Sequence, residues 1–252
     1  MQLSRLARFT VFTLLDYARS GRVLVEVIAA IVAYGLLFRP TGTPMSPEAF
    51  FSLTGILTLI GACYSTSMIM GLSDRAQGYL VLSRRIGRAG YLVGHYLAAL
   101  LVATLIYALL SLLTAILSPV AGLGFGGWVL GSLPLVLNIA VVAAAVTLLA
   151  PIVLTAGWRL VLLGAVALAF SGSLINGQAL NTISPVLRNL LGTLQVACSA
   201  PLLPVFTGFA LSVSRDYSPA SVAILLAQLS LTCGLLALAL YAFTKREIVL
   251  QG

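Results

Sequence analysis

The sequence has very little charge. Of its 252 residues only 8% are Asp, Glu, Lys or Arg, whereas 60% are hydrophobic. Soluble domains contain about 25% charged residues, so the composition excludes a soluble globular domain and a disordered chain. It indicates a polytopic membrane protein. The net charge of +8 is then explained by membrane topology, and we expect no binding to nucleic acid.

The residues that several common active sites require are also scarce. Lys245 is the only lysine and follows no glycine-rich turn, so the chain has no P-loop for ATP. His95 is the only histidine, which excludes the H-E-x-x-H zinc motif. The three cysteines, Cys63, Cys198 and Cys233, lie in apolar runs without metal-ligand spacing, and we expect them to be buried and unpaired. We expect no catalytic residue, metal or cofactor on this chain.

Long apolar runs make up most of the sequence. A helix needs about 20 apolar residues to cross the hydrocarbon core, and these runs are too continuously apolar for a membrane β-barrel. The six candidate spans are Val23–Phe38, Ala49–Leu72, Tyr91–Leu117, Trp128–Leu154, Thr155–Ile175 and Ala220–Phe243. We therefore predict one all-α transmembrane domain, residues 1–252, with six transmembrane helices.

The first 20 residues differ from the spans. They interleave leucine, phenylalanine and valine with Arg5, Arg8 and Asp16 at roughly helical spacing. This pattern predicts a helix that lies in the membrane interface and leads into the first span. The alternative is a frayed basic N-terminus.

The region before the last span, residues 176–219, is predicted to be external. It contains the uncharged stretch Asn189–Ser214, interrupted by Pro201 and Pro204. Such a stretch suits a helix–break–helix that enters the membrane and returns, shielded by neighbouring helices. The alternative is a seventh span.

The basic residues orient the spans. With the N-terminus in the cytoplasm, eleven of the 14 Lys and Arg residues lie on the cytoplasmic side, as the positive-inside rule requires. Counting residues 189–214 as a seventh span leaves ten on that side, so charge alone does not decide. We predict six spans, with both termini in the cytoplasm, in the inner membrane of a prokaryotic cell.

Three polar residues within the spans are candidates for lining a transport path: Glu26, Asn138 and Gln228. Charged residues inside a membrane often mark ion or substrate pathways. The alternative for Glu26 is a carboxylate at the start of a helix, paired with Arg22 four residues earlier. For Asn138 and Gln228 the alternative is hydrogen bonding between helices.

Residues 73–90 form a strongly basic predicted cytoplasmic loop. Within it, Tyr79, Leu80 and Leu82 make an apolar cluster beside four arginines. A solvated loop has no need of such a cluster, whereas a loop that docks onto another protein does. The alternative is that the arginines only hold the loop at the inner leaflet.

The sequence Asp74-Arg75-x-x-Gly78, continued by Leu82-Ser83-Arg84-Arg85-Ile86-Gly87-Arg88 and Gly94-His95-Tyr96-Leu97-Ala98, resembles the first cytoplasmic loop of type-2 ABC exporter permeases. Arg85, Gly87 and His95 stand where that family typically has proline, serine and lysine. The resemblance implies that the loop is a coupling helix that docks onto an ATPase. Its coupling residues would be Asp74, Gly78, Tyr79, Leu80, Leu82, Arg84, Arg85 and Arg88.

The resemblance also implies partners. Such permeases work as dimers with two separate ATPase subunits, which hold the ATP and Mg²⁺. Small residues of the second span, Gly55, Gly61 and Ala62, would let a second permease subunit approach closely. The predicted function is ATP-driven export of a lipid-like or amphipathic substrate. The alternatives are a non-transporting assembly or maturation component, and a secondary transporter.

Overall fold

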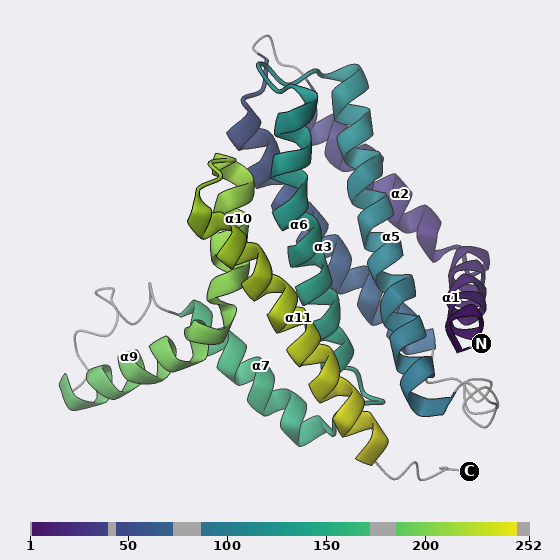
Figure 1. Cartoon of the computed structure of the whole chain (residues 1–252), viewed down its shortest axis with the longest axis vertical. Helices are drawn as coiled ribbons and strands as arrows, with labels where there is room; N and C mark the ends of the chain where they lie inside the picture. The colour runs from purple at the N-terminus through teal and green to yellow at the C-terminus, as the bar shows by residue number, and fades with distance from the viewer. Residues whose placement is uncertain (1, 40–43, 73–86, 172–184, 246–252) are drawn as a thin grey trace.

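The computed structural model describes residues 2–39, 44–72, 87–171 and 185–245, and every regular element in these ranges is a helix (Figure 1). The elements are α1 (Gln2–Arg19), α2 (Arg22–Ala33), η1 (Tyr34–Phe38), α3 (Pro47–Leu72), α5 (Gly87–Leu117), α6 (Phe125–Leu148), α7 (Ala156–Phe170), α9 (Pro185–Ser199), η3 (Ala200–Leu202), α10 (Leu203–Ser214) and α11 (Pro219–Lys245). The predicted all-α class is confirmed.

Five helical segments of the described chain are long and apolar enough to cross a membrane. They are α3, α5, α6, α11 and the continuous stretch Asn189–Ser214. The pair Ser4–Arg19 and Arg22–Phe38 passes the same test only when taken together, and it is bent by 72°. The described chain is therefore that of a helical membrane protein with five candidate spans, or six if the bent pair counts as one.

Two predicted spans differ in length from the helices. The fourth ends at Leu148, not Leu154, because a run of turns that contains Pro151 follows directly. The fifth was predicted over Thr155–Ile175, but α7 has 15 residues and ends at Phe170. That is shorter than the roughly 17 residues a full crossing needs. The part of this prediction beyond Ser171 falls outside the described residues.

A helix is present at the N-terminus, so the frayed alternative is wrong. Its buried side chains, among them Phe9, Thr13 and Tyr17, recur every four residues and face the bundle. Val11 and Phe12 are exposed on the outer side. Gly21, with φ of 76°, makes the sharp turn into α2, a backbone conformation that glycine adopts without strain.

Two helices are present where the sequence predicts a helix–break–helix, and together they are long and apolar enough to cross a membrane, so the re-entrant path stays a prediction. α9 and α10 are separated by the short 3₁₀ segment η3, which contains Pro201. α9 lies beside α7 and projects from the bundle, whereas α10 packs against α6, α3 and α11 (Figure 1). α10 is thus part of the bundle.

Three contacts show which loops share one end of the bundle. Arg215 forms an ion pair with Glu48, Tyr217 donates a hydrogen bond to the Leu130 carbonyl, and the Ala121 amide donates to the Met45 carbonyl. The end of α10 therefore lies at the same end as the starts of α3 and α6. Since α7 begins at the opposite end, the chain between α6 and α11 makes one net crossing.

The core is packed through aromatic rings and small residues. Phe51 lies directly against Gly131, where a Cβ atom would overlap its ring. Gly55 is similarly packed against Phe209, and Ala62 is fully buried. These two small residues are used within the chain, so the prediction that they face a second subunit is wrong for them.

The cysteines also differ from prediction. Cys63 and Cys233 are exposed on the outer surface of the bundle, and Cys198 is half-buried. All three are free, as expected. In a chain this apolar, the lipid-facing surface takes the same small hydrophobic residues as the core, so composition does not distinguish the two positions.

Candidate functional site

Most of the predicted coupling residues lie outside the described part of the chain. These are Asp74, Gly78, Tyr79, Leu80, Leu82, Arg84 and Arg85. Arg88 is described, in the first turn of α5, and its Nη1 donates a 3.1 Å hydrogen bond to the Thr244 carbonyl near the end of α11. The end of the predicted coupling loop is thereby attached to the last helix.

α1 is attached to the same region of α5. The Phe9 ring packs at a tilt against the rings of Tyr91 and His95, with centroids 5.4 and 5.2 Å apart respectively. Its ring lies directly on Gly94, where a Cβ atom would overlap it. The one histidine is buried in this aromatic cluster, and its Nδ1 lies 3.0 Å from the Tyr91 carbonyl. Among the described residues no group of three His, Cys, Asp or Glu residues is placed to hold a metal ion.

Asn138 and Gln228 meet in the bundle core. Both are fully buried, and Gln228 Nε2 donates to Asn138 Oδ1 at 2.6 Å and to the Pro134 carbonyl at 3.2 Å. Asn138 Nδ2 donates to the Val205 carbonyl at 3.1 Å. The two amides therefore link α6, α10 and α11 by hydrogen bonds, which is the alternative that the sequence left open for them.

Glu26 occupies a different position. It lies on α2 and is only 6% exposed. The Tyr17 hydroxyl, on α1, donates to Glu26 Oε1 at 2.7 Å, and the Ser65 hydroxyl, on α3, lies 2.6 Å from the same oxygen. Ser65 Oγ is also 2.8 Å from the Gly61 carbonyl. Because a serine hydroxyl has one proton, it donates to one of these two oxygens at a time.

The second carboxylate oxygen of Glu26 has no such partners. Oε2 is buried and has no hydrogen-bond partner among the described residues. The pairing with Arg22, which the sequence left open as the alternative for Glu26, is absent: the only ion pair within the described ranges joins Arg215 and Glu48. Arg22 instead donates to the Met68 carbonyl at 3.2 Å. A buried carboxylate with one unpaired oxygen is costly, and this marks Glu26 as a candidate functional residue.

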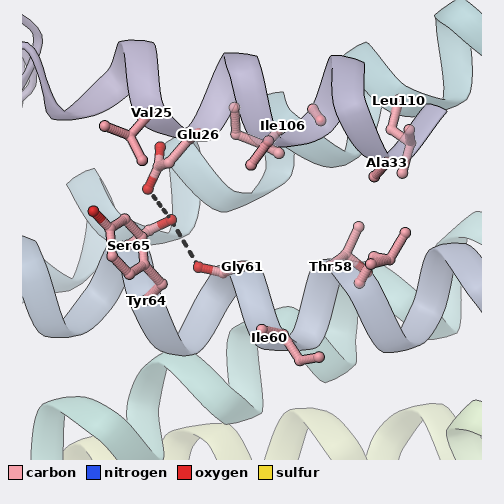
Figure 2. Close-up of a pocket in the computed structure, with 13 residues that line it drawn as sticks. Val25, Glu26, Ala33, Thr58, Ile60, Gly61, Tyr64, Ser65, Ile106 and Leu110 are labelled. Atoms are coloured by element: carbon pink, nitrogen blue, oxygen red, sulfur yellow. Dashed lines mark hydrogen bonds between the residues drawn. The ribbon is translucent and has the colours of Figure 1, made fainter. Parts of the chain in front are cut away.

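Glu26 also borders a cavity of about 290 Å³ between α2 and α3, closed behind by α5 (Figure 2). Figure 2 shows the Glu26 side chain reaching from α2 toward Ser65, with Tyr64 beside it on α3. Ile106 and Leu110 contribute the α5 side of the cavity. Asn138 and Gln228 are not among its lining residues.

Sequence reasoning singled out Glu26 but missed Tyr17 and Ser65. Both side chains are buried, Tyr17 in the amphipathic N-terminal helix and Ser65 in α3, and neither stands out in the sequence by type or spacing. Tyr17 lies nine residues before Glu26, and Ser65 lies 39 residues after it. The 72° bend between α1 and α2 brings the Tyr17 hydroxyl within hydrogen-bond distance of the Glu26 carboxylate.

The chain has no match among the family models, the curated proteins or the solved structures with which it was compared.

Proposed function

We propose that this chain is the membrane-spanning subunit of an ATP-driven exporter of the type-2 ABC class, with ATP hydrolysed by a separate subunit. The proposal starts from the resemblance of residues 74–98 to the coupling loop of such permeases. One observation in the described chain supports it: the segment that follows the loop is attached to both α1 and α11.

These contacts would transmit a movement of the loop to other helices. A displacement of the loop would move the start of α5. Because the Phe9 ring packs directly against Gly94, α1 would move together with α5. α1 in turn bonds to α2 through Tyr17 and Glu26, beside the cavity. The Arg88–Thr244 hydrogen bond connects the same point to α11. Nucleotide-driven closure of a docked ATPase would thus bias several helices at once, as a two-state transporter requires.

The test is co-purification from native membranes. Tyr79→Ala combined with Leu82→Ala removes two predicted interface anchors, and truncating such anchors typically costs about 1–4 kcal/mol of binding free energy. We expect the tagged wild-type chain to retain an ABC ATPase and to support ATP-dependent transport. We expect the double variant to lose both while reaching the membrane at normal abundance.

Phe125→Ala is the matched control, because Phe125 is 86% exposed and begins α6 at the opposite end of the bundle. It should retain both the ATPase and transport. If the double variant binds and transports like wild type, the coupling-loop assignment is wrong and the loop serves only as a basic membrane anchor.

A second candidate, a gradient-driven secondary transporter, is favoured by one observation, the buried Glu26 carboxylate beside a cavity. It predicts uptake or release by the purified chain alone in proteoliposomes under an imposed proton gradient. Transport that needs ATP and a co-purified ATPase, and that stays unchanged by the gradient, would exclude it.

A further inference from the structure

The cavity beside Glu26 opens toward the surface of the bundle that faces lipid. Its rim includes Val25 and Ile60, which are 55% and 63% exposed. Large apolar side chains exposed on a membrane-spanning bundle face the hydrocarbon chains. A molecule dissolved in the bilayer therefore reaches the cavity between α2 and α3 without crossing the bundle core.

The walls of the cavity are apolar apart from one region and from Thr58, whose hydroxyl already donates to backbone carbonyls of its own helix. Alanines and aliphatic side chains of α2, α3 and α5 form most of the surface, and Glu26, Tyr64 and Ser65 lie together at one side (Figure 2). Such a shape accommodates an apolar body with a single polar group. A few convergent polar groups in an apolar pocket are typical of small-molecule sites.

One oxygen of the Glu26 carboxyl group has no hydrogen-bond partner in the described part of the chain. Tyr17 and Ser65 both approach Glu26 Oε1, and Oε2 is left buried without a hydrogen-bond donor. The nearest arginine along the chain, Arg22, donates to the Met68 carbonyl and forms no ion pair with Glu26. A group that brings both a positive charge and an N–H donor would satisfy Oε2 and keep the carboxyl ionised in its buried position.

We propose that this cavity binds lipophilic primary amines, with the ammonium group bonded to Glu26 Oε2 and the hydrocarbon body in the space between α2 and α3. An ammonium supplies the charge and an N–H donor together, and such charge-assisted hydrogen bonds are the stronger kind. Tyr64 lies on the same wall of the cavity as Ser65. A divalent metal ion would need several more oxygen ligands than one carboxylate provides.

This inference goes beyond the proposed function, because it concerns binding by the chain alone. It needs no ATPase partner and no transport cycle. A failure of amine binding would leave the coupling-loop test unaffected, and a failure of that test would leave the amine site intact.

The experiment measures binding of radiolabelled dodecylamine to the full chain in phosphatidylcholine nanodiscs, with empty nanodiscs to subtract partitioning into lipid. We expect saturable binding to the wild type. Glu26→Gln keeps an oxygen for the Tyr17 and Ser65 hydroxyls but removes the charge. It should weaken binding at least about tenfold, the effect expected from losing a charged hydrogen-bond partner.

Gly61→Leu tests the cavity without changing Glu26. A Cβ atom at Gly61 meets nothing within 4 Å, so the larger side chain enters the cavity rather than clashing with the helix packing. It should abolish saturable binding. Gly71→Leu is the matched control, since Gly71 lies on the same helix, has equally open space and does not line the cavity.

Two competitors test whether binding needs both the positive charge and the N–H donor of the amine. Dodecanol has the same chain without charge, and dodecyltrimethylammonium has the charge without an N–H donor. Both should compete at least about tenfold more weakly than unlabelled dodecylamine. The proposal is overturned if binding to the wild type does not exceed that of empty nanodiscs, if Glu26→Gln or Gly61→Leu binds like wild type, or if either competitor equals the amine.

Discussion

At the scale of single residues, Pro134 explains why the Leu130 carbonyl is free to accept a hydrogen bond from Tyr217. Proline has no amide proton, so Pro134 leaves the Leu130 carbonyl, four residues earlier in α6, without its helical donor. The Tyr217 hydroxyl, from the loop between α10 and α11, supplies that donor at 2.7 Å. A residue that interrupts one helix thus fixes the position of a loop far away in sequence.

Replacing Tyr217 tests this compensation. Tyr217→Phe removes the hydroxyl and leaves the Leu130 carbonyl without its donor, which we expect to lower the free energy of unfolding by about 0.5–1.5 kcal/mol. Tyr241→Phe is the control, because Tyr241 is 63% exposed and its hydroxyl makes no hydrogen bond in the described chain. Denaturation of the purified variants in one detergent gives the comparison. Equal stability of both variants and wild type would contradict the role of Tyr217.

The same residue predicts an alkaline effect. Burial raises the pKa of the Tyr217 phenol above its ordinary value of 10.0. A raised pKa in the folded state means that the contribution of Tyr217 is complete below pH 10.0 and is lost as the pH rises through the folded-state pKa. The stability difference between wild type and Tyr217→Phe should therefore shrink in alkaline buffer. A difference that stays constant or grows would contradict the assignment.

At the scale of helices, the contact of Phe9 with Gly94 decides how α1 lies on α5. The α5 backbone at Gly94 accepts the Phe9 ring only because glycine has no side chain there. The aromatic ring is buried between α1 and α5 with Tyr91 and His95. One small residue therefore adds a close contact between α1 and α5 to the hydrogen bond that joins α1 and α2 through Tyr17 and Glu26.

A change at Gly94 should release this helix. Gly94→Ala places a methyl group into the Phe9 ring, and overpacking of this kind typically costs about 1–3 kcal/mol. We expect faster amide hydrogen exchange over Gln2–Arg19, while exchange in α6 stays unchanged. Combining Gly94→Ala with Phe9→Ala removes the overlap and should restore part of the protection lost in the single variant. No change in exchange on Gly94→Ala would show that α1 is not held at this point.

At the scale of the whole molecule, the arrangement of the loops fixes which ends lie together. Residues 45–48, 118–130 and 214–218 meet at one end, through the Arg215–Glu48 ion pair and two hydrogen bonds. The seventh-span alternative places Arg215 on the opposite side of the membrane from Glu48, so their direct contact favours six spans over seven. The predicted positive-inside orientation then places this shared end outside the cell.

Cysteine labelling tests that orientation. In a chain with Cys63, Cys198 and Cys233 replaced by serine, we expect Ala121→Cys to react with an impermeant thiol reagent in intact cells. Ala156→Cys, at the start of α7, should react only after permeabilisation, since it lies at the other end of the bundle. Both residues are exposed, so accessibility of the thiol itself does not differ between them. Reversed labelling would contradict a cytoplasmic N-terminus.

The bounds of three spans could be predicted from the length of their apolar runs alone. α3, α5 and α11 begin and end within four residues of the predicted runs. α7 is shorter than predicted, because the apolar composition of Thr155–Ile175 gives no sign of where the helix ends. Similarly, Gly55 was expected at a subunit contact and is instead covered by Phe209 of α10, a contact that no local pattern signals.

The sequence by itself determined that this is an all-α membrane protein with a helical N-terminal segment and a proline-broken helix before the last span. Those properties follow from the length of apolar runs and from proline, which act locally along the chain. The tertiary structure alone decided that Tyr17, Glu26 and Ser65 meet beside one cavity, while Asn138 and Gln228 pair elsewhere. These contacts join residues on different helices. They therefore depend on the bend at Gly21 and on the packing of α2, α3 and α5, which no stretch of sequence encodes alone.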